Sequence, residues 1–269
     1  MKNLKKYLML LLIITSLSAF LISCNDEDDT TTQGTSKVTV RMTDAPGDYD
    51  EVNVEVLDVM IKNNSGSDEG GWVSIGNISP GIYNLLDLTG GITVLLADNE
   101  VPSGYLGQLR LVLGDENTVV KDGVTYALNT PSAQQSGLKL QINQTLQAGA
   151  TYNFLLDFDV EHSVVVEAGG SGNYNLHPVI RVTTEATSGA IKGTVLPITV
   201  QTLASVEVNG TVVSAYTNEQ GVFQLNGVPS GTYTVTLTPD VASGLAVLVV
   251  DNVVVVNGEI TNMGSLTLP

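Results

Sequence analysis

Residues 37–43 read Lys-Val-Thr-Val-Arg-Met-Thr, and their alternation is a clear indication of the fold class. Apolar side chains occupy every second position, at Val38, Val40 and Met42, with polar side chains between them. Successive side chains of a β-strand point to opposite faces, so the pattern predicts a strand with one face in a core and one in water. Similar short stretches recur along the chain between turn residues. The sequence therefore predicts an all-β protein, and we expect β-sandwiches of the immunoglobulin-like kind.

Three dipeptides between apolar stretches predict hairpin turns. They are Asp-Gly at 122–123, Asn-Gly at 209–210 and Asp-Asn at 251–252. The apolar run at 253–256 predicts a core strand covered on both faces. No stretch has the sustained 3.6-residue period of a long helix.

A change in composition near residue 185 divides the body of the chain into two predicted domains. The polar segment 185–189 (Glu-Ala-Thr-Ser-Gly) follows one apolar strand and precedes another, which is typical of a linker. We expect one β-sandwich domain at 37–185 and a second at 189–269, the latter able to fold alone. The only cysteine of the chain is Cys24, so no disulfide within the chain can link the domains.

The N-terminal residues predict export and lipid anchoring. Residues 1–6 carry three lysines and no acid, and residues 7–22 are almost wholly apolar but too short for a bilayer span. Leu-Ile-Ser-Cys at 21–24 then resembles the lipobox of bacterial lipoproteins. That resemblance implies a signal peptide at 1–23 and a diacylglycerol on Cys24, which would hold the protein at the membrane.

The segment after the cysteine predicts a tether. Residues 24–36 contain the acidic run at 25–29 and no aliphatic or aromatic side chain, so they cannot form a core. The acidic run resembles the surface-export signal of one group of Gram-negative lipoproteins, and it is equally typical of a solvated linker. We expect a protein anchored in the outer membrane, with display on the cell surface as the open question.

The charge of the chain excludes nucleic acid as a partner. The chain has 28 acidic against 11 basic residues and a net charge of −17. Cleavage before Cys24 would remove three of the lysines and no acid. A protein this acidic repels polyphosphates and anionic lipid surfaces.

Two families resemble parts of the chain. Residues 217–223 (TNEQGVF) and 228–235 (VPSGTYTV) resemble the carboxypeptidase regulatory-like domain, although Asn218 stands where Asp is common. This resemblance covers about 189–269 and implies a transthyretin-like sandwich that is usually non-catalytic. Thr-Asp-Ala-Pro at 43–46, with several phrases up to about residue 184, resembles an uncharacterised family of bacterial lipoproteins. This resemblance implies a fold and a cellular location but no activity. Sandwiches of this kind are often grouped with carbohydrate-binding folds.

Carboxylates are the best candidates for a chemical site. Alternation places Asp157, Asp159 and Glu161 on one face of a predicted strand, and Asp44 could join them. Such a row could bind Ca²⁺ through its oxygens. The favoured interpretation is that the row is a solvated outer face of an acidic protein. A hydrolase that uses the row is the least favoured hypothesis.

Trp72 is the single tryptophan. It could be a platform on which a sugar stacks, but the favoured interpretation is a side chain that fills the core or its rim. The two histidines, His162 and His177, accompany no Gly-x-Ser-x-Gly motif, and one cysteine cannot build a typical zinc site. We therefore expect a non-catalytic module that binds carbohydrate or an envelope protein, with a structural spacer as the alternative.

The anchor is testable by mutation. Cys24→Ala removes the thiol that would carry the diacylglycerol, so the variant is expected to incorporate no labelled palmitate and to remain uncut or soluble. Metabolic labelling followed by membrane fractionation measures both properties. Normal labelling of the variant would contradict the lipobox interpretation.

Overall fold

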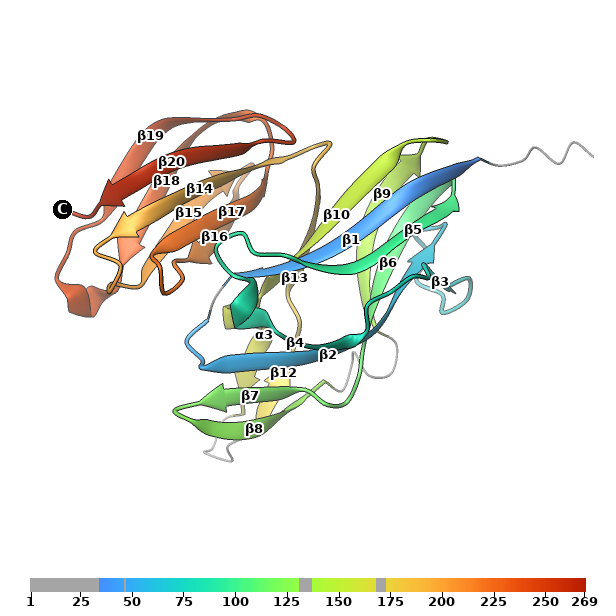
Figure 1. The fold of residues 1–269 in the computed structure, drawn as a ribbon, viewed down its shortest axis with the longest axis horizontal. Coiled ribbons are helices and arrows are strands. Elements are labelled where there is room, and N and C mark those ends of the chain that lie inside the picture. Colours follow the sequence, from blue (N-terminus) through green and yellow to red (C-terminus); the bar gives the residue numbers. More distant parts are fainter. Residues whose placement is uncertain (1–33, 46, 131–136, 168–172) are drawn as a thin grey trace, which may run out of the picture. The chain divides into compact units, whose positions relative to one another are not determined.

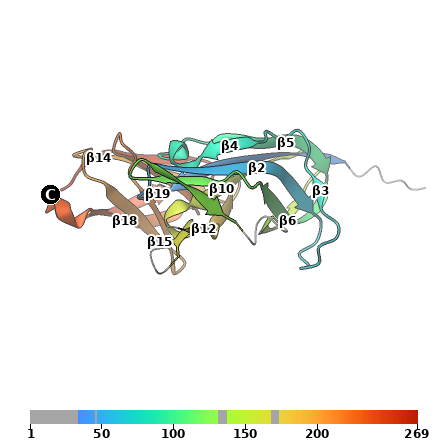
Figure 2. The same cartoon turned by 90° about the horizontal axis from the view of Figure 1, so that it is seen from below.

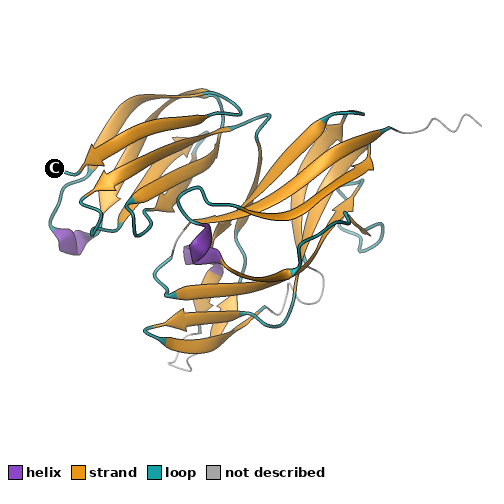
Figure 3. Ribbon diagram, in the orientation of Figure 1, coloured by secondary structure: helices purple, strands orange, loops and turns teal. Residues whose placement is uncertain are grey.

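The computed structural model describes residues 34–45, 47–130, 137–167 and 173–269 (Figure 1). Strands make up most of the described chain (Figure 3), which confirms the all-β prediction. The predicted signal peptide at 1–23 and most of the tether lie outside the described residues.

Strands between residues 35 and 184 form two sheets around one apolar core, and we call this part the first sandwich. One sheet has the order β13-β10-β1-β5; the other has the order β11-β12-β8-β7-β2-β6-β9, and β3 and β4 also pair with β2. Figure 2 shows β4 beside β2. The bounds are β1 Thr35–Ala45, β2 Glu51–Lys62, β3 Val73–Ser74, β4 Gly81–Asn84, β5 Val94–Pro102, β6 Gly104–Leu113, β7 Thr118–Lys121, β8 Val124–Asn129, β9 Leu138–Leu146, β10 Thr151–Asp159, β11 Val164–Val166, β12 Tyr174–Leu176 and β13 Ile180–Thr184.

Strands between residues 189 and 267 form two further sheets with a second apolar core, and we call this part the second sandwich. The orders are β17-β14-β20 and β16-β15-β18-β19. The bounds are β14 Gly189–Leu196, β15 Thr202–Val208, β16 Thr211–Tyr216, β17 Val222–Val228, β18 Gly231–Pro239, β19 Leu248–Val255 and β20 Ile260–Thr267.

β1 lies inside the smaller sheet of the first sandwich. It pairs in parallel with β10 and antiparallel with β5. Val38, Val40 and Met42 are each 0% exposed, as the alternation predicts. The strand therefore combines an apolar face in the core with hydrogen-bonded neighbours on both edges.

β1 begins earlier than the predicted tether of 24–36 allows. The strand starts at Thr35, and Ser36 is only 1% exposed. The hydroxyl of Ser36 donates to the carbonyl oxygen of Gln147 at 2.8 Å, which satisfies a buried polar group. The tether prediction was therefore wrong at Thr35 and Ser36, because the backbone there pairs with residues 101–102 of β5.

β2 exchanges partners along its length. Its first residues pair with β7 and its last with β6, and the register with β6 breaks after Val56. Asn117, 2% exposed, bonds β2 between the part paired with β7 and the part paired with β6. Its Oδ1 accepts from the backbone N–H of Glu55 at 2.8 Å. Its Nδ2 donates to the carbonyl oxygen of Gly114 at 2.7 Å. The side chain replaces a missing backbone partner.

Two of the three predicted hairpins are confirmed. Segments 122–123 and 209–210 join β7 to β8 and β15 to β16, with positive φ at both residues of each turn. The third prediction was wrong, because 251–252 lies inside β19. Asn252 has φ 62°, and the register with β18 shifts beside it. The dipeptide forms a β-bulge in a continuous strand.

The run at 253–256 is not covered on both faces, contrary to the prediction. Val253 and Val255 are buried, whereas Val254 is 56% and Val256 is 47% exposed. β19 is an edge strand of its sheet, and only one face of that sheet meets the second core. Local composition alone cannot distinguish such a strand from a central one.

Helices are short in the described ranges. They are η2 at Leu85–Leu88, α3 at Val160–Ser163 and η3 at Val241–Ser243. Over the part of the chain that the structure describes, no helix is both long and apolar enough to cross a bilayer.

Asn117 provides a test of the partner exchange in β2. Asn117→Ala leaves the Glu55 N–H and the Gly114 carbonyl without this partner in a buried place, which costs about 2–3 kcal/mol of unfolding free energy. Chemical denaturation measures the loss. Asn129→Ala, at an exposed position on β8, is the control and should change the value by less than about 0.5 kcal/mol. Equal values for the two variants would contradict the assigned role.

Candidate functional site

The predicted row of three acids does not lie on one strand face. β10 ends at Asp159, and Glu161 lies in α3, beyond the end of the strand. Asp157 forms an ion pair with Arg181, its direct neighbour on β13. The alternation argument therefore fails at Glu161, because the chain changes from strand to helix at Val160.

The other two carboxylates have structural partners of their own. Asp159 caps α3, accepting from the backbone N–H of His162 at 3.1 Å and contacting its ring Nδ1 at 2.8 Å. This hydrogen bond raises the pKa of His162. Asp44, 5% exposed, accepts from the backbone N–H of Val160 at 3.3 Å. Within the described ranges, no three acidic, histidine or cysteine side chains are grouped to hold a metal ion. Ca²⁺ binding by the row stays a prediction.

A second group of candidate residues centres on Lys62, at the end of β2. Its side chain is 0% exposed, and its ammonium donates to the carbonyl oxygens of Asp68 at 2.7 Å and Gly66 at 3.2 Å. Asp68 Oδ1 lies 3.0 Å from the same nitrogen. A buried ammonium needs such partners in place of water. Lys62 thereby holds the loop at residues 63–72 against the sheet.

β6 supplies the floor beneath this loop. Gln108 and Arg110 lie on the polar face of the strand, yet they are only 1% and 9% exposed because the loop covers them. Gly107 permits the close approach, since a Cβ there would lie 2.2 Å from the backbone of Asn64. Gln108 Nε2 donates to the carbonyl oxygen of Gly66 at 3.0 Å.

Trp72 lies over this cationic floor and not in the apolar core. Its ring centroid is 4.1 Å from Arg110 Cζ and 5.6 Å from Lys62 Nζ, which is the geometry of cation–π contacts. Trp72 is half-buried and does not belong to the side chains packed against the first core. The structure thus places it as a ring supported by cations on a polar surface.

Three buried polar atoms of the same cluster have no hydrogen-bond partner in the described part of the chain. They are Trp72 Nε1, Gln108 Oε1 and Arg110 Nε. Buried polar atoms are nearly always paired with protein or with water. Buried water is the usual partner of such atoms, so the three atoms mark this part of the sheet surface as polar rather than apolar.

Glu69 pairs with two cations beside Trp72. Its carboxylate contacts Arg110 Nη2 at 2.7 Å and the ammonium of Lys139 on β9. The hydrogen bond from Lys139, followed by that from Arg110, lowers the pKa of Glu69. Glu69 itself is 62% exposed, so these pairs contribute little to stability. We call Lys62, Glu69, Trp72, Gln108, Arg110 and Lys139 the tryptophan cluster.

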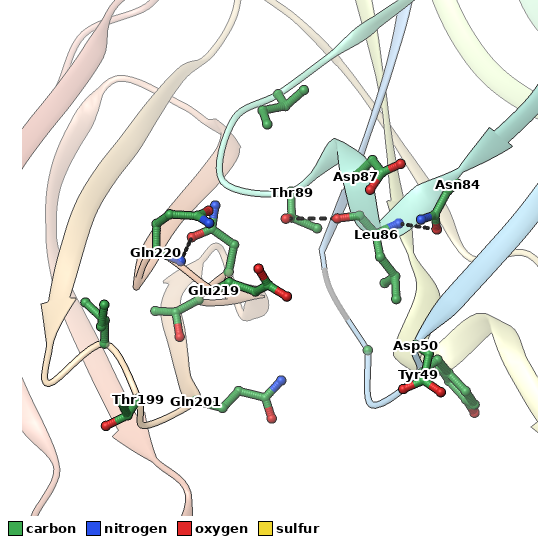
Figure 4. Close-up of a pocket in the computed structure, with 15 residues that line it drawn as sticks. Tyr49, Asp50, Asn84, Leu86, Asp87, Thr89, Thr199, Gln201, Glu219 and Gln220 are labelled. Carbon is green, nitrogen blue, oxygen red and sulfur yellow. Dashed lines mark hydrogen bonds between the residues drawn. The ribbon is translucent and has the colours of Figure 1, made fainter. Parts of the chain in front are cut away.

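A separate polar hollow has a volume of about 540 Å³. Figure 4 shows the side chains that line it. Its lining includes Tyr49, Asp50 and Asp87, with amides from Asn84 and Asn218. Both amide oxygens already accept backbone hydrogen bonds: Asn84 caps η2 at Leu86, and Asn218 accepts from Gln220. These amides stabilise local turns, so the tryptophan cluster is the stronger candidate.

Sequence reasoning found Trp72 but missed the cations around it. The small number of basic residues could have drawn attention to these cations. Only eight basic residues follow Cys24, and the cluster contains three of them. Their meeting point depends on the pairing of β2, β6 and β9, which are far apart in the sequence.

A family model described as "Domain of unknown function (DUF4382)" matches residues 35–178. No curated protein matches the chain. Among solved structures, the Bacillus anthracis TIE protein is 13% identical over 88% of this chain and 34% of that one, with a TM-score of 0.23. The shaft pilin SpaA from Lactobacillus rhamnosus GG is 10% identical over 87% of this chain and 97% of that one, with a TM-score of 0.21. BcpA, the major pilin subunit of Bacillus cereus, is 11% identical over 87% and 70%, with a TM-score of 0.23. The chain spans about a third of the TIE protein, and likenesses this distant carry no argument about function.

The pair of Asp157 and Arg181 yields a pH-dependent prediction. Burial raises the pKa of Asp157, and Arg181 opposes that rise. In Arg181→Leu the folded-state pKa lies further above the unfolded value of about 3.9, so stability present at low pH is lost as the pH rises through the folded pKa. We expect the variant to lose about 2 kcal/mol at pH 7 and clearly less at pH 4, below the 3–5 kcal/mol of fully buried pairs because Arg181 is 34% exposed.

Urea unfolding at the two pH values measures the difference. The double variant Asp157→Asn, Arg181→Leu removes the titrating group and should lose the added pH dependence. The same loss at pH 4 and pH 7 for Arg181→Leu would show that burial of the Asp157 carboxylate is not its cause.

Proposed function

Because the chain belongs to the DUF4382 family, a domain of unknown function, we propose its role from its own residues: a non-catalytic binding module that lipid on Cys24 holds at the outer membrane. The lipobox and the basic, apolar signal sequence support the anchor. The acidic tether supports a body held away from the lipid surface. The resemblance of 189–269 to the carboxypeptidase regulatory-like domain supports a second sandwich that accompanies the binding domain.

The tryptophan cluster is the observation that carries the binding role. Sugars bind proteins through a flat aromatic ring that contacts their C–H face and through polar groups that bond their hydroxyls. Trp72 supplies the ring, and Gln108 and Arg110 supply polar atoms that lack partners within the described residues. Carbohydrate is therefore the ligand that we propose for this module.

One observation favours the structural spacer as a second role. β19 is an edge strand of its sheet and exposes Val249 at 53% and Val254 at 56%. Exposed apolar edge strands are places where another chain can add a strand. The acid row offers no comparable support for a hydrolase, since Asp157 is paired with Arg181 and Asp159 caps α3.

A glycan array probed with the detergent-solubilised lipoprotein tests the binding role. Trp72→Ala should weaken every positive signal by about tenfold or more, which corresponds to about 1.4 kcal/mol, because the stacking surface is lost. Trp72→Phe should retain part of the binding. Val73→Ala, next to the ring at a 63% exposed position, is the matched control. Signals that do not depend on Trp72 would move the site elsewhere, and an array without signals would contradict carbohydrate binding.

A further inference from the structure

We propose that the tryptophan cluster recognises an acidic sugar, a uronate, and that Glu69 occupies the position of the sugar carboxylate until the ligand displaces it. This inference rests on the proposed carbohydrate-binding role and adds the charge of the ligand. It follows from the arrangement of two cations on neighbouring strands.

Arg110 and Lys139 are direct cross-strand partners on β6 and β9. Like charges in directly opposite positions destabilise a sheet, so an anion between them is stabilising. The carboxylate of Glu69 supplies this anion by contacting both side chains. The cations thus belong to the sheet, whereas the anion belongs to a loop.

The loop is fixed to the sheet as far as Asp68, and Glu69 is the first side chain beyond that attachment. Lys62 and Gln108 both bond the carbonyl oxygen of Gly66, and the backbone at Asn64 packs against Gly107. Glu69, in contrast, is 62% exposed and is followed by two glycines. A ligand carboxylate can therefore replace Glu69 while the base of the loop stays in place.

The atoms beneath the tip suit the remainder of a sugar. Trp72 Nε1 and Arg110 Nε can donate to hydroxyl oxygens, and Gln108 Oε1 can accept from a hydroxyl. These atoms have almost no accessible surface in this structure, so a sugar hydroxyl reaches them only when the tip of the loop moves away. The Trp72 ring beside them provides the apolar contact.

The chemistry of the tryptophan cluster and the charge of the whole chain favour a single carboxylate over a phosphate polymer. A planar guanidinium matches a planar carboxylate with two parallel hydrogen bonds. The net charge of −17 repels polyanions from the protein as a whole. A short uronate oligomer meets both conditions.

Glu69→Gln tests the inference, because it removes the competing carboxylate. Calorimetric titration of the full lipoprotein in nonionic detergent compares trigalacturonate with neutral galactotriose. We expect Glu69→Gln to bind trigalacturonate about tenfold or more tightly than the unmodified protein, with galactotriose affinity unchanged. Glu207→Gln, at an exposed position on β15, removes the same charge elsewhere and should leave both affinities unchanged.

Further arms separate the explanations. Adding Lys139→Gln to Glu69→Gln should abolish the gain for trigalacturonate; Lys139 is partly exposed, and a thermal melt of each variant confirms that it folds. Equal affinities in the Glu69→Gln and Glu207→Gln variants would overturn the inference. Inorganic sulfate binding as tightly as trigalacturonate would overturn the sugar and leave a general anion site.

The proposed function and this inference fail differently. Trp72-dependent binding of galactotriose without any preference for trigalacturonate would refute the uronate and leave the carbohydrate-binding role intact. Absence of binding to either saccharide, in every variant and on the array, would refute both.

Discussion

The buried ammonium of Lys62 is the charge on which the candidate site depends. An ion without water must find several acceptors, and Lys62 finds them in the loop that directly follows its own strand. This requirement brings residues 63–72 down onto the sheet. The same fold of the loop covers Gln108 and Arg110 and places Trp72 over a guanidinium. One desolvated charge thus determines which side chains of the polar face are shielded and which face water.

The sheets that carry the site are held by apolar packing and by hydrogen bonds between strands. With one cysteine in the chain, no internal disulfide contributes, and two separate cores of Val, Leu, Ile and Phe side chains supply the apolar burial. Where strands change partners, side chains complete the hydrogen bonding. Asn117 does so between β2 and the start of β7, with its oxygen on Glu55 and its nitrogen on Gly114. Such a residue carries no signal in an apolar pattern, because its role exists only when both segments are in place.

Several predictions succeeded because their causes are local. Alternation at Val38, Val40 and Met42 follows from strand geometry, and the turn at 209–210 follows from the tolerance of Asn and Gly for positive φ. Others failed where a distant part of the chain decides. The segment at 251–252 has turn composition, but pairing with β18 keeps it inside a strand. Glu161 continues an alternating pattern, but the chain enters α3 before reaching it.

The all-β class and two of the three hairpins could be predicted without a structure, because period-two patterning and turn chemistry act over a few residues. Composition alone showed that basic residues are scarce. It also singled out Trp72 as the one tryptophan. Only the tertiary structure decided what surrounds that ring. Arg110 and Lys139 become neighbours through the pairing of β6 with β9, and Glu69 reaches them through the loop that Lys62 holds. A site built from three strands and a loop depends on register between distant segments, and register is set by how the whole sheet packs on its core.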